Sequence, residues 1–167
     1  TDVYEFDPLR GTWVALSPVS SPRSGHRMVF SKGRIWVLGG NSAICESYDF
    51  ASDTWRDEAA LNTARSWSVA WSSDGDIFVG GGNSPGSDSV EILREGTSQW
   101  LPFNDKLPVK RYGADAIVHK DKVFIVSGKY SGSFSRKVYA AYLPTPATNL
   151  YSKDGNATAE AATSPAL

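Results

Sequence analysis

The sequence is poor in the residues from which most catalytic and metal sites are built. Cys45 is the only cysteine, and His26 and His119 are the only histidines among 167 residues. A lone cysteine excludes an internal disulfide and, with no visible signal peptide, fits a reducing compartment such as the cytoplasm. The chain begins with Thr rather than Met, so its localisation stays open. Metal sites generally need three or four convergent ligands, so we expect no metal and no cofactor.

Long apolar runs and an excess of one charge are also missing. No run approaches the roughly 20 residues of a membrane span, and no basic block interrupts a chain of net charge −1 and pI near 6.1. We therefore expect neither a membrane nor a nucleic acid as partner. Aromatic residues are plentiful instead, with six Trp, seven Tyr and seven Phe, and no stretch keeps a helical period over three turns. This composition predicts an all-β protein of short strands.

Three segments of the chain, residues 22–41, 64–83 and 110–129, repeat one pattern. In each, an Arg precedes a Gly–Gly or Ser–Gly pair by 16 residues, and a Trp precedes that Arg by 10 or 11 residues. The repeated positions are Arg23, Arg65 and Arg111; Gly39–Gly40, Gly81–Gly82 and Ser127–Gly128; and Trp13, Trp55 and Trp100. The repeat length of 42 to 46 residues is typical of propeller blades.

Each repeat predicts four strands, the first after the Arg and the last carrying the Trp. A two-residue turn at Lys32–Gly33, Asp74–Gly75 or Lys120–Asp121 joins the first strand to the second. The second strands are nearly continuous apolar runs, which is typical of strands buried on both faces. We expect the glycine pairs to admit neighbouring backbones, the Trp residues to cover gaps between blades, and the Arg residues to brace turns and carbonyl groups.

The order Arg, Gly–Gly, Tyr-Asp and Trp resembles the kelch motif, most clearly in "SYDFASDTW" at 47–55. The resemblance covers about residues 3 to 142 and implies kelch-type β-propeller blades, four-stranded antiparallel sheets that usually close through strands from both termini. It divides the chain into a propeller segment, 1–143, and an Ala/Thr/Pro-rich tail, 144–167. The repeats lie near 17–58, 59–103 and 104–143, with 1–16 supplying strands of a shared blade.

About three blades fit in this chain, whereas closed propellers need about four to eight. Two chains could form a six-bladed ring, the chain could be part of a longer propeller, or an open half-propeller could pack on a partner. We favour the homodimer, because the spare strands at the N-terminus complement the fourth strand that the last blade lacks.

Propellers bind ligands on loops at the ends of the central channel. Two sets of loops are expected at one rim, those after each repeated Arg and those after each glycine pair. In kelch proteins that bind peptides, the positions matching Ser24, Ser66 and Tyr112 are among those that face the ligand. The candidate rim residues are Ser24, His26, Asn41, Ser66, Trp67, Asn83, Tyr112, Lys129 and Tyr130.

The sequence declares no catalytic machinery, so we expect a non-catalytic module that recognises a protein or peptide through this rim. No serine lies in a nucleophile elbow, and the Gly-rich segment 80–89 lacks the Gly-Lys-Ser/Thr of a phosphate loop. Two alternatives stay open. One is a carbohydrate-directed protein, a lectin or a kelch enzyme resembling sugar mutarotases, and the other is a structural half-propeller that builds an assembly.

Overall fold

The computed structural model describes residues 2–82, 88–130 and 133–143, and the calls on Asn83 and on the tail lie outside these residues. The described residues form strands and turns, with no helix. Within them, no helix is long and apolar enough to cross a membrane. The all-β prediction is therefore confirmed.

The chain opens with an antiparallel hairpin and continues into a four-stranded antiparallel sheet. The hairpin consists of β1 (Val3–Asp7) and β2 (Thr12–Leu16). The first sheet, in spatial order, is β3 (Arg27–Ser31), β4 (Arg34–Leu38), β5 (Cys45–Asp49) and β6 (Thr54–Glu58). Lys32 and Gly33 both have positive φ, 55° and 71°, as a tight hairpin turn between β3 and β4 requires.

Two further sheets repeat this meander. The second comprises β7 (Val69–Ser73), β8 (Asp76–Gly80), β9 (Val90–Leu93) and β10 (Trp100–Phe103). The third has three strands among the described residues, β11 (Asp115–His119), β12 (Lys122–Val126) and β15 (Val138–Tyr142). Between β12 and β15 lies a small hairpin that the repeat pattern did not predict, β13 (Lys129–Tyr130) and β14 (Ser133–Phe134).

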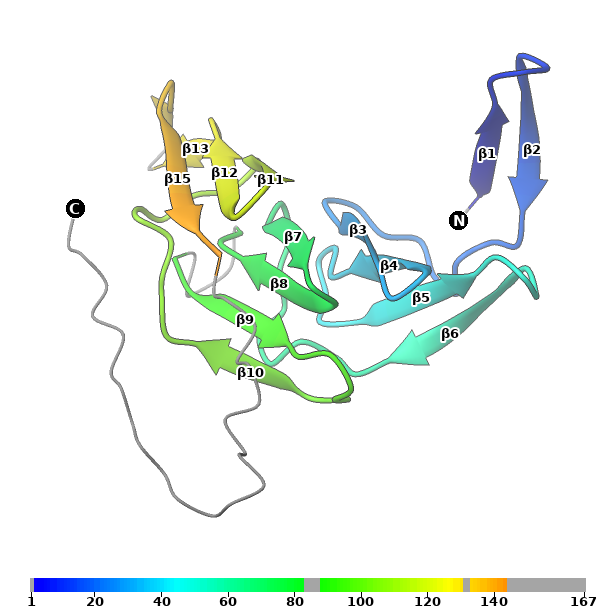
Figure 1. Ribbon diagram of the computed structural model, residues 1–167, viewed down its shortest axis with the longest axis horizontal. Helices are drawn as coiled ribbons and strands as arrows, with labels where there is room; N and C mark the ends of the chain where they lie inside the picture. Colours follow the sequence, from blue (N-terminus) through cyan, green and yellow to red (C-terminus); the bar gives the residue numbers. More distant parts are fainter. Residues whose placement is uncertain (1, 83–87, 131–132, 144–167) are drawn as a thin grey trace.

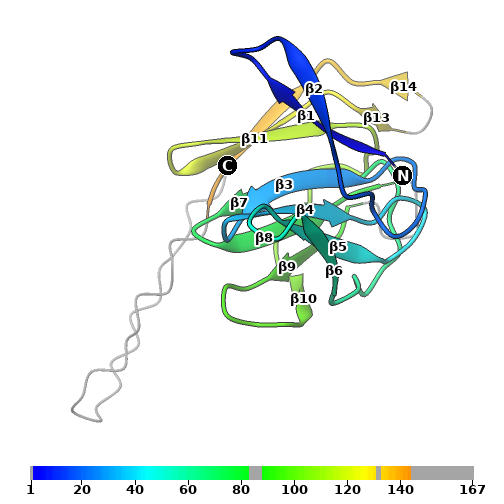
Figure 2. The same cartoon turned by 90° about the vertical axis from the view of Figure 1, so that its right-hand side faces the viewer.

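The three sheets form an open arc, with the β1–β2 hairpin at one end and the third sheet at the other (Figure 1). The first strands of the sheets are innermost, because β3 packs against β7 and β7 packs against β11. Figure 2 shows the β13–β14 hairpin at the same end of the molecule as the start of β3. We call the sheets blades one, two and three, since four-stranded meanders around a common centre are the architecture of a propeller.

The apolar core lies between the blades rather than within them. One cluster, including Trp36, Leu38, Ile77 and Trp100, joins blades one and two. A second cluster, including Phe78 and Ile125, joins blades two and three. Blade two is therefore buried on both faces, while blades one and three each keep a face without a neighbouring blade among the described residues.

Two of the repeated Trp residues tie the outermost strand of a blade to the segment that leads into that blade. Trp100 is 2% exposed, and its indole N–H donates to the carbonyl of Ala59, 2.9 Å away. Trp55 donates to the carbonyl of Ser17, at 2.7 Å. Trp13, by contrast, is 67% exposed and packs against Phe6 of its own hairpin.

The repeated Arg residues brace the loops of their own blades. Arg65 is 1% exposed and donates to the carbonyl of Gly81 (2.7 Å), the hydroxyl of Ser89 (2.8 Å) and the carboxylate of Glu91 (3.0 Å). Glu91 also accepts a hydrogen bond from the backbone N–H of Asn62, at 2.6 Å. In blade one, Arg23 forms an ion pair with Glu46, and both side chains are buried.

The glycine pairs allow the next blade to approach. The N–H of Gly40 donates to the carbonyl of Arg65 at 2.9 Å. A Cβ on Gly39, which has a φ of 65°, would lie 2.7 Å from that same carbonyl oxygen. Only glycine combines this backbone conformation with this close contact without a clash.

We predict that Arg65→Ala destabilises the protein by about 3–5 kcal/mol, because it leaves the Glu91 carboxylate buried without its cation. Urea unfolding measures the change in the free energy of unfolding. The control is Arg94→Ala, which removes a pair with Asp76 in which the Arg side chain is 44% exposed. The free energy of unfolding of that variant should fall by less than about 1 kcal/mol. Equal losses in the two variants would contradict the bracing role.

We also predict that the Cys45 thiol is inert in the folded protein. Cys45 is 1% exposed, and burial raises its pKa to about 12, so the thiol stays protonated at pH 8. Labelling with Ellman's reagent at pH 8 should therefore be slow in buffer and reach one thiol per chain in denaturant. Fast labelling of the folded protein would contradict the buried position of Cys45 in β5.

Candidate functional site

Three equivalent residues, each two positions after a repeated Arg, form a hydrogen-bonded chain across the blades. They are Gly25, Trp67 and Gly113. The N–H of Trp67 donates to the carbonyl of Gly25 at 2.7 Å, and the N–H of Gly113 donates to the carbonyl of Trp67 at 2.7 Å. All three have positive φ, 69°, 56° and 63°. The loops preceding the first strands of the three blades are thus tied together.

Of the three hydrogen-bonded residues Gly25, Trp67 and Gly113, only Trp67 is not a glycine. A left-handed backbone conformation costs a residue other than glycine roughly 1 kcal/mol or more, and such strain is concentrated at functional sites. Although aromatic and bulky, Trp67 is 48% exposed, so its indole is not explained by core packing alone. Blades one and three place glycine at this position, which shows that the fold itself does not need an indole here.

Trp67 lies beside a cavity of about 350 Å³ between blades two and three. Tyr112 and Lys129 line the same cavity, together with Phe134 and the Ser127–Gly128 pair. The backbones of Tyr112 and Lys129 pair directly, with N–H to carbonyl distances of 3.1 Å and 2.8 Å. The structure therefore brings together residues from both sets of loops, those after the Arg and those after the glycine pair.

Tyr130 follows on the β13–β14 hairpin and is 52% exposed. It lines a neighbouring cavity of about 610 Å³, and Lys129 and Phe134 line both cavities. The Lys129 ammonium lies 4.4 Å from the centre of the Phe134 ring. Four of the candidate rim residues, Trp67, Tyr112, Lys129 and Tyr130, thus share one surface, which we call the rim site.

The other candidate residues lie elsewhere. Ser24 and Asn41 are exposed on loops of blade one. His26 lines a different cavity, and its pKa is lowered by burial and by the nearby charges of Arg23 and Arg27. Ser66 is 6% exposed because Gly25 lies over it, so the structure corrects its placement on the exposed rim.

Arg27 is a central residue that the sequence analysis missed. Its guanidinium donates to the carbonyl of Ser68 at 2.5 Å and to the carbonyl of Ala114 at 2.7 Å, and so links the innermost strands of all three blades. The corresponding positions in blades two and three are Val69 and Asp115. Because the residue is not repeated, the repeat pattern carries no signal for it.

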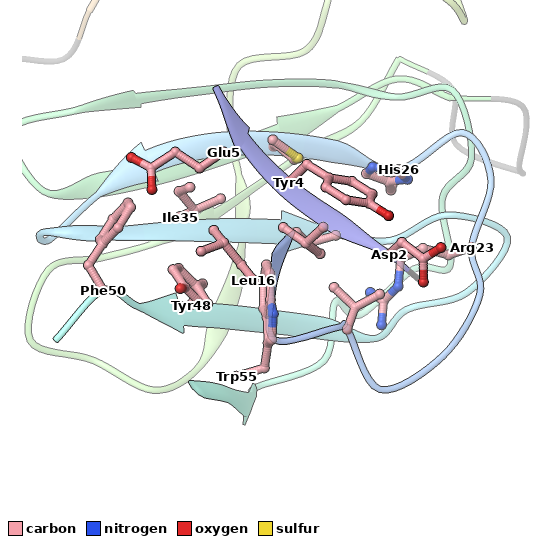
Figure 3. Close-up of a pocket in the computed structure, with 14 residues that line it drawn as sticks. Asp2, Tyr4, Glu5, Leu16, Arg23, His26, Ile35, Tyr48, Phe50 and Trp55 are labelled. Carbon is pink, nitrogen blue, oxygen red and sulfur yellow. The ribbon is translucent and has the colours of Figure 1, made fainter. Parts of the chain in front are cut away.

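A cavity of about 580 Å³ separates the β1–β2 hairpin from blade one (Figure 3). Tyr4 and Leu16 of the hairpin face Ile35, Tyr48 and Trp55 of the blade across it.

Within the part of the chain that the structure describes, no three His, Cys, Asp or Glu side chains converge as a metal site would require. Cys45 lies in the core between blades one and two. The rim site holds aromatic side chains and the ammonium group of Lys129, which are groups suited to binding.

Comparison with known proteins identifies relatives that match most of this chain. Mouse (Mus musculus) Kelch-like protein 35 is 26% identical over 142 residues, which cover 80% of this chain and 25% of the relative. Kelch-like protein 25 of Xenopus tropicalis is 25% identical over 150 residues, covering 86% of this chain and 25% of the relative. Beta-scruin of Limulus polyphemus is 29% identical over 131 residues, covering 70% of this chain and 14% of the relative.

The chain thus spans about a quarter or less of the length of these curated relatives. No family model matches the sequence. The matches to these kelch-like relatives nevertheless extend over most of the chain. The chain itself has four-stranded sheets and the repeated Arg, Gly–Gly and Trp positions. On these grounds the chain is similar to kelch-repeat proteins over most of its length, and its sheets fit kelch-type propeller blades.

Proposed function

We propose that this chain is a non-catalytic binding module that recognises a protein or peptide through the rim site. The supporting observation is Trp67, a half-exposed indole held in a left-handed backbone conformation where the other two blades have glycine. Aromatic side chains on rigid backbones are frequent anchors in protein interfaces, because they bury a large area at a small cost in entropy. The hydrogen bonds on both sides of Trp67 fix its backbone before any ligand arrives.

Neighbouring groups extend this anchor. Tyr112 adds a second aromatic ring beside the cavity, and Lys129 adds a positive charge. A ligand at this position would contact loops of blades two and three at once. The relatives named for their kelch repeats are consistent with an interaction module as the general role of the chain.

We predict that Trp67→Gly weakens ligand binding and keeps the fold, since glycine adopts this φ freely and stands at the equivalent positions. Peptides selected from a displayed random library against the wild-type protein supply the ligand. Their affinity should fall by at least about tenfold in Trp67→Gly, while the free energy of unfolding changes by about 1 kcal/mol or less.

The matched control is Leu101→Ala, which removes a side chain of similar exposure, 44%, from the outermost strand of the same blade. It should leave the affinity unchanged. If Trp67→Gly also binds normally, the rim site is not the recognition surface. If no peptide is selected but a glycan array shows binding that depends on Trp67, the ligand is a carbohydrate instead.

A second proposal concerns the two ends of the arc, which we propose associate head to tail in a homodimer. At one end the β1–β2 hairpin exposes Tyr4 (56%) and Trp13 (67%), and at the other end blade three exposes Ile117 (64%) and Tyr142 (72%). Residues 104–143 contain eight Lys and Arg against three Asp, whereas residues 2–103 contain eight Lys and Arg against thirteen Asp and Glu. A head-to-tail contact would bury the aromatic surfaces and bring opposite net charges together.

We predict that light scattering on a sizing column gives twice the chain mass of 18.1 kDa. Trp13→Asp should return the protein to the monomer, because it places a charge in the apolar contact. A wild-type monomer at all concentrations would exclude the dimer. It would leave the binding proposal for the rim site untouched, since that site lies within one chain.

A further inference from the structure

The third blade lacks the carboxylate that neutralises the repeated Arg in the other two. Glu46 pairs with Val37 in the sheet register, and Glu91 pairs with Val79. In blade three the corresponding pair is Ile125 and Tyr139. Tyr139 therefore occupies the position of the two glutamates.

Arg111 is left without an anionic partner as a result. It is 2% exposed, and its Nη1 donates to the carbonyl of Ser127 at 2.6 Å. Its Nε and Nη2 are buried and have no hydrogen-bond partner among the described residues. The Tyr139 ring lies over the guanidinium, with its centre 4.5 Å from the central carbon. A ring face attracts a cation, but it does not accept the remaining N–H groups as a carboxylate would.

A second change in blade three matches the first. The backbone N–H of Ser20 donates to Glu46 at 3.0 Å, and that of Asn62 donates to Glu91 at 2.6 Å. The corresponding residue, three positions before Arg111, is Pro108, which has no N–H. Both the internal carboxylate and its backbone donor are thus replaced, while the arginine is kept.

The surroundings of Arg111 favour an anion. The cavity of about 610 Å³ beside it is also lined by Lys129, Arg136 and Lys137, and no Asp or Glu is among the residues that line it. Three aromatic rings, those of Tyr130, Phe134 and Tyr139, form further parts of its wall. The cavity is much larger than a single carboxylate, and its rings match the apolar stems of long side chains.

We infer that this cavity binds the carboxylate side chains of an acidic peptide, with Arg111 as the buried anchor. The inference rests on the proposed binding of peptides at the rim site, and it names the chemistry of the ligand there. Tyr139 is partly exposed and its ring covers Arg111, so the ring has to turn outward for a carboxylate to take the place that Glu46 and Glu91 occupy in the other blades. Lys129 joins the two cavities, so one peptide can contact both.

The test is the binding of fluorescein-labelled hexaglutamate, followed by fluorescence anisotropy at low salt. Tyr139→Glu supplies an internal carboxylate to Arg111, so the affinity should fall by at least about tenfold. Thermal unfolding shows whether this variant is folded, and its midpoint should rise because the buried charge is now paired. Tyr139→Ala uncovers Arg111 and should tighten binding.

The matched control is Leu101→Glu, which adds the same charge to an exposed position on β10, the outermost strand of blade two, away from the residues that line the cavity. Its effect should be much smaller than that of Tyr139→Glu. Equal losses of affinity for hexaglutamate in both variants, or no loss of affinity in either, would overturn the inference.

Two kinds of competitor show whether the site prefers an anion other than an acidic peptide. Displacement of the peptide by inorganic phosphate or glutarate at low concentration would show a site for small anions, and equally tight binding of an oligothymidylate would show a site for any polyanion. Either result would overturn the acidic peptide as ligand. If library-selected peptides depend on Trp67 but hexaglutamate does not depend on Tyr139, this inference fails and the proposed function stands.

Discussion

The structure depends on a buried arginine at the start of each blade. In blade two, Arg65 donates to the carbonyl of Gly81 and the carboxylate of Glu91, while its own backbone carbonyl accepts a hydrogen bond from Gly40 of blade one. One residue thereby joins the loops within a blade to the neighbouring blade. Hydrogen bonds hold the residues that follow these arginines, and a preformed loop presents its side chains to a ligand at low entropic cost.

Much of the fold was predictable from the sequence because its main constraints recur. The N–H groups of Gly40 and Gly82 donate to the carbonyls of Arg65 and Arg111 in the next blade, so the glycine pair is repeated with the spacing of the blades. The predicted strands and hairpin turns agree with those observed. Features that occur once were not predictable in this way, including Arg27, whose role follows only from the meeting of three innermost strands.

The rim site was predicted only in part, for a physical reason. The repeat places Ser66 and Trp67 side by side on a rim loop, but it does not say which of two adjacent residues points inward. The left-handed backbone at Trp67 decides this, turning the indole outward while Ser66 is buried beneath Gly25. Similarly, the replacement of a glutamate by Tyr139 becomes visible only when the strand register is known.

The central claim is that ligands bind at the loops between blades two and three. Hydrogen exchange with mass spectrometry, with and without a library-selected peptide, tests it directly. The account predicts that protection increases at residues 65–67, 111–113 and 129–130, which carry the rim site. Protection confined to the β1–β2 hairpin and the face of blade one across its cavity would contradict the account, because recognition would then occur at the open end of the arc.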